Sequence, residues 1–336
     1  MASLILIPYM PLFLGIDAGG TRTRAALLNE MGEYLGYGET GSGNPSNIGV
    51  EAACERYAEA ALKAHLDAGL KEIDLEGCFL ACAGVKSEVE AEVIRRRVSE
   101  SGWISYVDCQ VGNDLEAALT GGLIGKPGLA LVAGTGSFCL GRDETGHRSR
   151  CGGWGWILDD VGGASWLGLR GLQSAAFSSE GRVGKTILLE RSLAFLDLTD
   201  PDEIQRAVIQ QTQPDGIARF AVEVVKAAVE EDEIANQILE QGAAGLAELV
   251  ATVARQLNWP DGPIALVLCG SVARGGDPYQ PLIEKAVLGL GIGISLCEPV
   301  FSPVAGAALQ AIIQSGQKVE SPLIEMLKQT DKEPKC

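Results

Sequence analysis

The stretch LFLGIDAGGTRTRAALL, residues 12–28, consists of an apolar run, a polar turn rich in glycine, and a second apolar run. This order predicts two strands joined by a tight turn. Asp17 falls where the first predicted strand ends, so its carboxylate faces whatever the turn encloses. The sequence therefore predicts a hairpin with a carboxylate at its mouth.

The turn itself has the composition of an anion cradle. Gly19 and Gly20 lack side chains, so backbone N–H groups there can approach an anion, and the hydroxyls of Thr21 and Thr23 add donors. A carboxylate beside a phosphate cradle is explained by a divalent cation between them, because the metal screens their repulsion. An ordinary β-hairpin with a Gly-Gly turn is the alternative interpretation.

The composition bounds the class of protein. A chain of 336 residues exceeds one compact core and suggests two domains, and 46% hydrophobic with 21% charged residues is typical of a globular protein. A net charge of −17 argues against a nucleic-acid partner, which needs a basic surface. Nine scattered cysteines without zinc spacing indicate a reduced, cytoplasmic chain. No stretch is long and apolar enough to predict a membrane span.

The first part of the chain has the element order of a ribonuclease-H-like unit. The hairpin continues into a third strand, which completes an antiparallel meander, and a loop follows. Helices and strands then alternate, giving the order βββαβαβα. The expected ranges are a strand over 34–38, a loop over 41–47, a helix over 51–68, a strand over 77–83, a helix over 88–101, a strand over 104–111 and a helix from 115 to 120.

The pattern restarts at GLALVAGTGSFCL, residues 128–140, which is again strand, glycine turn and strand. Two weakly similar halves predict two like domains facing each other across a cleft. The expected first domain is 1–117 plus about 303–330, and the second is 118–302. Within the second we expect helices from about 166 to 257, with breaks near 199–201 and 213–216, and strands at 263–269 and 294–297. A helix over 303–315 should return to the first domain, and 317–336 should be loose at its end.

Three glycine motifs around an Asn-Asp pair carry a family resemblance. The motifs are Asp17 to Thr21, Gly134 to Ser137 and Gly270 to Val272, and the pair is Asn113-Asp114. Over residues 12–314 the chain resembles the actin-like sugar kinases of the N-acetylglucosamine kinase type, grouped with the BadF/BadG/BcrA/BcrD ATPases. The resemblance implies an α/β fold of two ribonuclease-H-like (actin-like ATPase) domains flanking an interdomain cleft. It also implies ATP and Mg²⁺ as cofactors, an amino sugar as substrate, and a homodimer.

The resemblance implies a general base at Asp114, since a carboxylate at the mouth of a strand accepts the proton of a sugar hydroxyl as it attacks the γ-phosphate. From the residues alone, Asp114 is equally a helix N-cap. Asp17 would then hold Mg²⁺, through water. The nucleotide contacts implied by the resemblance are Gly19, Gly20, Thr21, Thr135, Gly136, Ser137, Gly270 and Ser271.

The sugar contacts implied by the resemblance lie in two segments. Asn47 belongs to the loop over 42–47, where its amide suits vicinal hydroxyls and simple turn chemistry is the alternative. The stretch CGGWGWILDDVGGA, residues 151–164, resembles the family's glycine-tryptophan-glycine segment, although Val161 stands where a glutamate is usual and Asp159 where a glycine is common. The full implied set is Asn47, Asn113, Asp114, Thr135, Cys151, Gly153, Asp160 and Ala164.

Four side chains close in sequence to the predicted motifs have structural interpretations. Trp154 and Trp156 could stack on a sugar, but tryptophans between glycines are more often part of a core. Arg22 and Arg24 flank the first phosphate loop, where solvated arginines at a strand edge are the favoured interpretation. Neither pair is therefore assigned to the predicted site.

The predicted function is ATP-dependent phosphorylation of the 6-hydroxyl of N-acetylglucosamine, with glucosamine as an alternative substrate. A second hypothesis is an ATPase activator of a 2-hydroxyacyl-CoA dehydratase, holding an iron–sulfur cluster through thiolates such as those of Cys78 and Cys82. A buried strand is a poor place for such a cluster. A sugar sensor without catalysis is the third, and both proposed carboxylates argue against it.

Overall fold

The structure is a computed structural model that describes residues 10–70, 74–102, 109–210, 214–259, 261–331 and 333. The chain divides into two compact units, the first running up to Lys126 and resuming at Pro299, the second spanning Pro127–Glu298. The first unit thus extends beyond the expected boundary at 117, because it contains the whole of helix α4 (Asp114–Leu123). Among the described residues no helix is long and apolar enough to cross a membrane.

The first unit is built on a five-stranded mixed sheet of order β3-β2-β1-β4-β5. Strand β1 pairs antiparallel with β2 and parallel with β4, as the predicted meander and crossover require. Residues 104–108 of one predicted strand lie outside the described residues. The strands are β1 (Leu12–Ala18), β2 (Thr23–Asn29), β3 (Tyr34–Thr40), β4 (Leu75–Cys82) and β5 (Cys109–Asn113).

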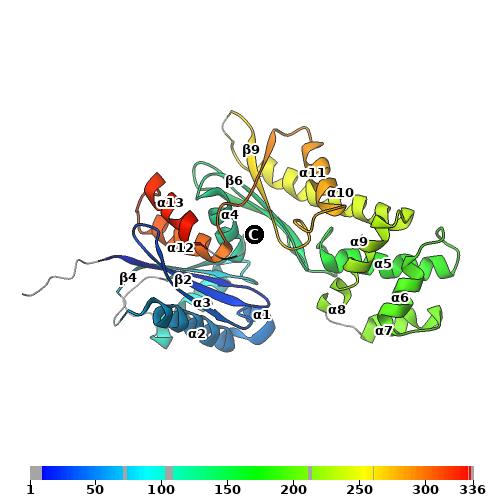
Figure 1. Ribbon diagram of the computed structural model, residues 1–336, viewed down its shortest axis with the longest axis horizontal. Coiled ribbons are helices and arrows are strands. Elements are labelled where there is room, and N and C mark those ends of the chain that lie inside the picture. The colour runs from blue at the N-terminus through cyan, green and yellow to red at the C-terminus, as the bar shows by residue number, and fades with distance from the viewer. Residues whose placement is uncertain are drawn as a thin grey trace, which may run out of the picture. The chain divides into compact units, whose positions relative to one another are not determined.

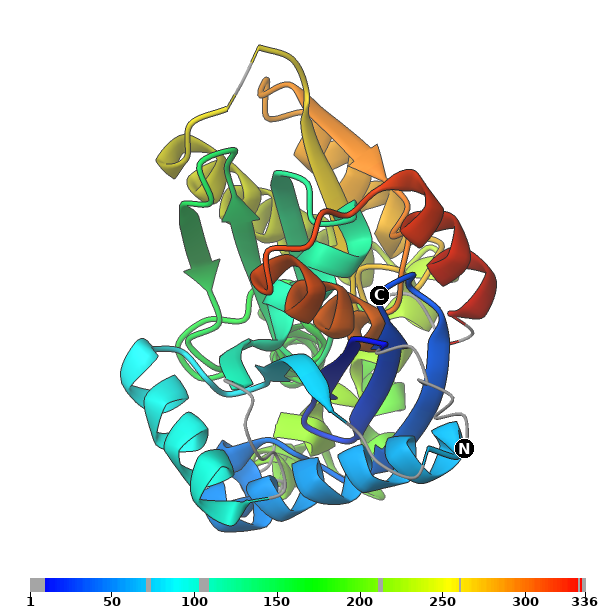
Figure 2. The same cartoon turned by 90° about the vertical axis from the view of Figure 1, so that its left-hand side faces the viewer.

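Side chains of β1 alternate between two cores. Leu14 and Ile16 are buried with α2 (Val50–Ala68) and α3 (Glu88–Ser101), whereas Phe13 is buried with α12 (Pro303–Gln314). Figure 2 shows the blue and cyan helices α2 and α3 on one side of the first sheet and the orange-red α12 and α13 on the other. The prediction that α12 returns to the first unit is confirmed. Asp17 projects to the same face of the sheet as Phe13, which is the face that α12 covers.

Helix α13 (Ser321–Thr330) occupies most of the expected tail, and residues 332 and 334–336, at the end that was expected to be loose, lie outside the described residues. Its Leu323 and Leu327 are buried in the same core as Phe13 of β1 and Leu28 of β2, although these strands stand at the other end of the chain. Figure 1 shows α13 near α12. Glu325 lies between these leucines and Lys328 follows them, so composition alone does not reveal the apolar face. The burial of two leucines is what orders the segment.

The second unit repeats the topology of the first. Its sheet, taken from the β8 edge, has the order β8-β7-β6-β9-β10, and this matches the order β3-β2-β1-β4-β5 of the first sheet strand by strand. This confirms the predicted pair of ribonuclease-H-like units. The strands are β6 (Gly128–Ala133), β7 (Ser137–Arg142), β8 (Arg148–Gly152), β9 (Ile264–Cys269) and β10 (Ile294–Cys297).

Helices fill the predicted stretch between β8 and β9. A 3₁₀ turn, η1, occupies the first expected break, and a short helix, α8, occupies part of the second. The helices are α5 (Ala164–Ser179), α6 (Leu188–Leu196), η1 (Pro201–Glu203), α7 (Ile204–Gln210), α8 (Pro214–Ala218), α9 (Ala221–Val229), α10 (Glu233–Gln256) and, between β9 and β10, α11 (Tyr279–Leu288).

Close packing of α12 on β1 depends on Gly15. A Cβ on Gly15 would overlap the backbone nitrogen of Ala308, so α12 would have to move. We expect Gly15→Ala to lower the free energy of unfolding by about 3 kcal/mol. Gly184→Ala is the control, because a Cβ there meets nothing within 4 Å. Urea unfolding of both variants tests this, and equal midpoints would contradict the packing argument.

Candidate active site

The first glycine loop connects β1 to β2 in the first unit. Gly19 N–H donates to the carbonyl of Arg22 at 2.8 Å, which closes the turn, and Gly20 and Thr21 are exposed. Thr23 is buried, and its hydroxyl donates to the carbonyl of Gly41 at 2.9 Å. Thr21 therefore presents the loop's hydroxyl, and the expectation that Thr23 adds a second donor is wrong.

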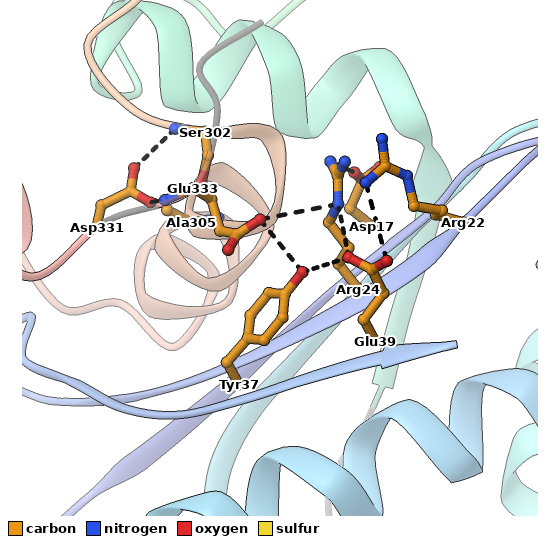
Figure 3. Close-up of polar contacts among 9 residues, drawn as sticks. All are labelled: Asp17, Arg22, Arg24, Tyr37, Glu39, Ser302, Ala305, Asp331 and Glu333. Carbon is orange, nitrogen blue, oxygen red and sulfur yellow. Dashed lines mark hydrogen bonds and ion pairs between the residues drawn. The ribbon is translucent and has the colours of Figure 1, made fainter. Parts of the chain in front are cut away.

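Asp17 lies at the end of β1, with its side chain only 15% exposed. Burial raises the pKa of this carboxyl and the positive charge of Arg24 lowers it, and because burial is the larger effect the pKa lies at about 6. Arg24 Nη1 stands 3.7 Å from Asp17 Oδ2. Figure 3 shows the two side chains next to each other. The prediction of a solvated Arg24 is wrong, since its side chain is also 15% exposed, whereas that of Arg22 is 57% exposed, as expected.

Asp114 is the first residue of α4, directly after β5. The N-cap is Asn113, whose Oδ1 accepts from the N–H of Leu115 at 3.1 Å, so the interpretation of Asp114 as the cap is wrong. Burial, and after it the negative charge of Asp17, raises the pKa of Asp114 to about 7. The two carboxylates are thus electrostatic neighbours within the first unit.

Asn113 is engaged at both ends of its amide. Besides capping α4, its Nδ2 donates to the carbonyl of Val85 at 2.7 Å. These bonds fix the junction between β5 and α4, and with it the place of Asp114. Asn113 therefore has a structural role in positioning its neighbour.

The predicted sugar loop lies against the first glycine loop. Gly43 N–H donates to the carbonyl of Gly19 at 3.1 Å, and a Cβ on Gly20 would lie 3.8 Å from Asn47 Nδ2. The loop contains one helical turn, α1 (Pro45–Ile48), which Asn44 caps. Asn47 is exposed on this turn, so its amide stands beside the phosphate loop and open to solvent.

The second glycine loop, between β6 and β7, is fixed to the start of α5. The N–H groups of Ala164 and Ser165 donate to the carbonyls of Gly134 and Thr135 at 2.8 and 3.0 Å. Thr135 is exposed, so its side chain is available to a ligand. Ala164 contributes backbone support to this loop.

Hydrogen bonds of Asp160 and Ser137 hold the second loop in place. Asp160 is 8% exposed, and its Oδ1 accepts from the N–H of Ser137 at 3.4 Å. A Cβ on Gly136 would lie 2.6 Å from Asp160 Oδ2, so the loop requires glycine there. Ser137 is fully buried and its hydroxyl donates to the carbonyl of Val161 at 2.8 Å, which removes its side chain from the predicted nucleotide contacts.

The segment after β8 has one side chain placed differently from expectation. Trp154 is 69% exposed, so the core interpretation is wrong for it, whereas Trp156 packs against the core of the second unit. Gly153 N–H donates to the carbonyl of Ser137 at 3.0 Å, and Cys151 is half-buried on β8 opposite Cys139. Both residues lie beside the second loop.

The third glycine motif follows β9. Gly270 has a left-handed φ of 92°, and a Cβ there would overlap the carbonyl of Ala133 at the end of β6. Val272 N–H donates to the same carbonyl at 3.0 Å. The exposed Ser271 therefore lies close to the second glycine loop, because β6 and β9 are parallel neighbours that end at one edge.

The donor set beside the first loop fits Mg²⁺. This ion prefers oxygen ligands and is held in phosphate-transfer sites by one or two carboxylates together with substrate phosphates. Asp17 offers carboxylate oxygens and Thr21 a hydroxyl. No group of three or more acidic, histidine or cysteine side chains suited to a metal occurs in the part of the chain that the structure describes, so a dedicated protein cage is not found there.

Two sheets of one topology, each with a glycine loop beside a buried carboxylate, define an actin-like α/β ATPase. The chain belongs to the BadF/BadG/BcrA/BcrD ATPase family, whose model matches residues 14–311. The solved structure of a candidate N-acetylglucosamine kinase from Chromobacterium violaceum has the same fold, with a TM-score of 0.68 at 24% identity, covering 95% of this chain and 100% of the other.

Two curated relatives are sugar kinases by name. An N-acetylmuramic acid/N-acetylglucosamine kinase from Clostridium acetobutylicum is 29% identical over 269 residues, which cover 78% of this chain and 86% of the relative. An N-acetyl-D-glucosamine kinase from Dictyostelium discoideum is 27% identical over 312 residues, covering 90% of this chain and 98% of the relative. Both alignments span the two units.

Proposed function

We propose that this protein is an ATP-dependent hexosamine kinase that transfers the γ-phosphate of ATP to the 6-hydroxyl of N-acetylglucosamine. The observation that carries the proposal is Asp114, a carboxyl with a pKa near 7 beside the carboxylate of Asp17 and the first glycine loop. The names of the two curated relatives support the substrate class. The amide of Asn47 beside Gly20 supplies a polar group for a sugar next to the phosphate loop.

In the proposed reaction, Asp114 accepts the proton of the 6-hydroxyl while the sugar oxygen forms its bond to the γ-phosphorus. The bond from that phosphorus to the bridging oxygen of ADP breaks as the new bond forms. A base with a pKa near 7 is ionised in about half of the molecules at pH 7 and still binds a proton in the transition state. Asn113 keeps this carboxylate in place through its bonds to Val85 and Leu115.

Asp17 and Thr21 would hold Mg²⁺, and the bound ion would neutralise charge on the transferring phosphate. The backbone of Gly19 and Gly20 provides N–H groups for the phosphates. In the second unit, Thr135 and Gly136 are the proposed phosphate contacts, and Gly270 and Ser271 the adenosine side. The buried Asp160 shapes the second loop and is our proposed sugar contact there.

The alternative of an iron–sulfur ATPase activator lacks structural support at the thiols considered for it. Cys78 and Cys82 are 2% and 0% exposed in the core of the first unit. The Sγ atoms of Cys78 and Cys109 lie 3.0 Å apart, and Cys82 contacts the hydroxyl of Tyr57. Ligands to a cluster shared between subunits need exposed thiolates, which these are not.

We also propose a cytoplasmic homodimer. No disulfide joins the cysteines that the structure describes, which suits a reducing compartment. The homodimer rests on the resemblance to sugar kinases. Light scattering of the purified chain tests it, with a mass near twice 35.2 kDa as the expected result.

Release of ADP across a panel of sugars tests the proposed function. The panel is N-acetylglucosamine, glucosamine, N-acetylmannosamine, N-acetylmuramic acid and glucose, each with Mg²⁺-ATP. We expect the highest kcat/KM with N-acetylglucosamine. A rate that no sugar raises above the sugar-free background would overturn the proposal, and a preference for glucosamine would reassign the substrate.

The pH dependence follows from the raised pKa of the base. Because Asp114 must be ionised to accept a proton, kcat/KM for the sugar should rise with pH and level off above about 7. Initial rates between pH 5 and 9 at saturating Mg²⁺ measure this profile. A flat profile between pH 6 and 8 would contradict the assignment of a base with this pKa.

A further inference from the structure

A row of charged side chains crosses the first sheet beside the proposed metal ligand. Asp17 on β1 is the register partner of Arg24 on β2, and Arg24 is the partner of Glu39 on β3. Register partners project to the same face of a sheet. Figure 3 shows the three side chains together with Glu333, which follows α13. Arg24 is therefore surrounded by three carboxylates.

The Arg24 guanidinium is held between these acids without a close bond to any of them. Arg24 Nη1 is 3.7 Å from Asp17 Oδ2, and Nε is 3.6 Å from Glu39 Oε2 and 3.9 Å from Glu333 Oε2. A tight pair between an arginine and a carboxylate has N–O distances of about 2.7–2.9 Å. Arg24 Nε is buried and has no hydrogen-bond partner among the described residues.

Glu333 is fixed in this position from two sides. The Tyr37 hydroxyl lies 2.7 Å from Glu39 Oε2 and 3.2 Å from Glu333 Oε2, so it bridges the two acids. Asp331 accepts from both the N–H and the hydroxyl of Ser302, the N-cap of α12, at 2.8 and 2.9 Å. Glu333 N–H donates in turn to Asp331 at 3.3 Å. The segment after α13 is thus anchored to the helix that packs on β1.

We propose that Glu333, together with Glu39, is a positioning residue that keeps Arg24 from closing on Asp17. The inference rests on the proposed function, in which Asp17 serves a Mg²⁺-nucleotide. Two carboxylates on the far side of Arg24 balance the attraction of Asp17, so the Asp17 oxygens stay available. Without Glu333, Arg24 is free to form a two-point pair with Asp17 that competes with the cation.

Glu333→Gln tests the proposal, with binding of Mg²⁺ and a nonhydrolysable ATP analogue measured by calorimetry. We expect the Mg²⁺ concentration for half-maximal analogue binding to rise about fivefold, while the affinity for sugar and the melting temperature stay unchanged. Glu325→Gln is the matched control. Glu325 lies on α13, and its ion pair is with Lys328 at 2.9 Å on the exposed surface. The control should bind as the wild type does.

A double-mutant cycle separates positioning from a simple loss of charge. In an Arg24→Gln background the competing guanidinium is gone, so Glu333→Gln should not raise the Mg²⁺ concentration for half-maximal analogue binding any further. An equal rise in both backgrounds, or wild-type binding by Glu333→Gln, overturns the inference. If Glu333→Gln fails to fold, Tyr37→Phe replaces it, and we expect about a threefold rise because the bridge to Glu333 is lost; wild-type binding by that variant overturns the inference too.

The same measurements separate this inference from the proposed function. Mg²⁺-dependent analogue binding that shifts as expected, in a protein that phosphorylates no sugar, would leave the inference standing and refute the kinase proposal. Sugar phosphorylation with no shift in Glu333→Gln would do the reverse. A wild-type protein without any Mg²⁺-dependent analogue binding would overturn both.

Discussion

Asp114→Asn lowers kcat for sugar phosphorylation by about a thousandfold, while the dissociation constant of ATP changes by less than about threefold. The amide occupies the same volume and keeps its place at the start of α4, but it does not take up the proton of the 6-hydroxyl. Stopped assays of ADP release and calorimetric titration with an ATP analogue give the two numbers. Because the change is confined to proton transfer, the loss should appear in kcat.

Asp197→Asn is the matched control for this variant. Asp197 is exposed at the end of α6 in a left-handed conformation that asparagine also adopts, so activity and binding should remain those of the wild type. Full turnover by Asp114→Asn would refute the assignment of the base. Loss of ATP binding in that variant would show instead that Asp114 organises the nucleotide site.

The same substitution should stabilise the fold at alkaline pH. The folded pKa of Asp114 is raised from 3.8 to about 7, so stability from its neutral form is present at low pH and is lost as pH rises toward 7. Asn carries no charge and avoids this loss. Unfolding by urea should show no gain for Asp114→Asn near pH 4 and a gain of at most about 4 kcal/mol at pH 8.

Asp160→Ala raises the KM for the sugar by about a hundredfold, with a smaller effect on the KM for ATP. The alanine removes the acceptor of the Ser137 N–H and leaves a void beside Gly136, so the second loop loses its support. It also places an ordinary residue at a φ of 57°, which aspartate and asparagine tolerate better. Asp160→Asn should therefore recover part of the loss.

Asp159→Ala provides the comparison for that result. Asp159 is the preceding residue, and its Oδ2 accepts from the N–H of Trp154 at 3.4 Å. We expect less than about a threefold change in either KM. Equal effects of the two alanines would contradict a specific role of Asp160.

Local signals predicted the parts of the fold that local chemistry determines. Alternating apolar residues and glycine turns located β1, β2, β6 and β7, and Ser87 with Glu90 forms a capping box that begins α3 at the expected residue. Both glycine loops were found because close backbone approach requires glycine. These features depend on residues only a few positions apart.

Features that depend on distant partners were not predicted. Arg24 resembles a solvated arginine until Glu333, from the other end of the chain, is seen beside it. The bond from Asn113 Nδ2 to the carbonyl of Val85, 28 positions earlier, was not predicted either. In each case the deciding contact joins segments that are not neighbours in sequence.

Phosphorus NMR of the wild-type protein with Mg²⁺-ATP and N-acetylglucosamine shows whether the γ-phosphate reaches the sugar. We expect one new phosphomonoester, on the 6-hydroxyl, formed in the same amount as ADP, and about a thousandfold slower formation with Asp114→Asn. ADP accompanied by inorganic phosphate alone, with no phosphorylated sugar, would contradict the proposed function.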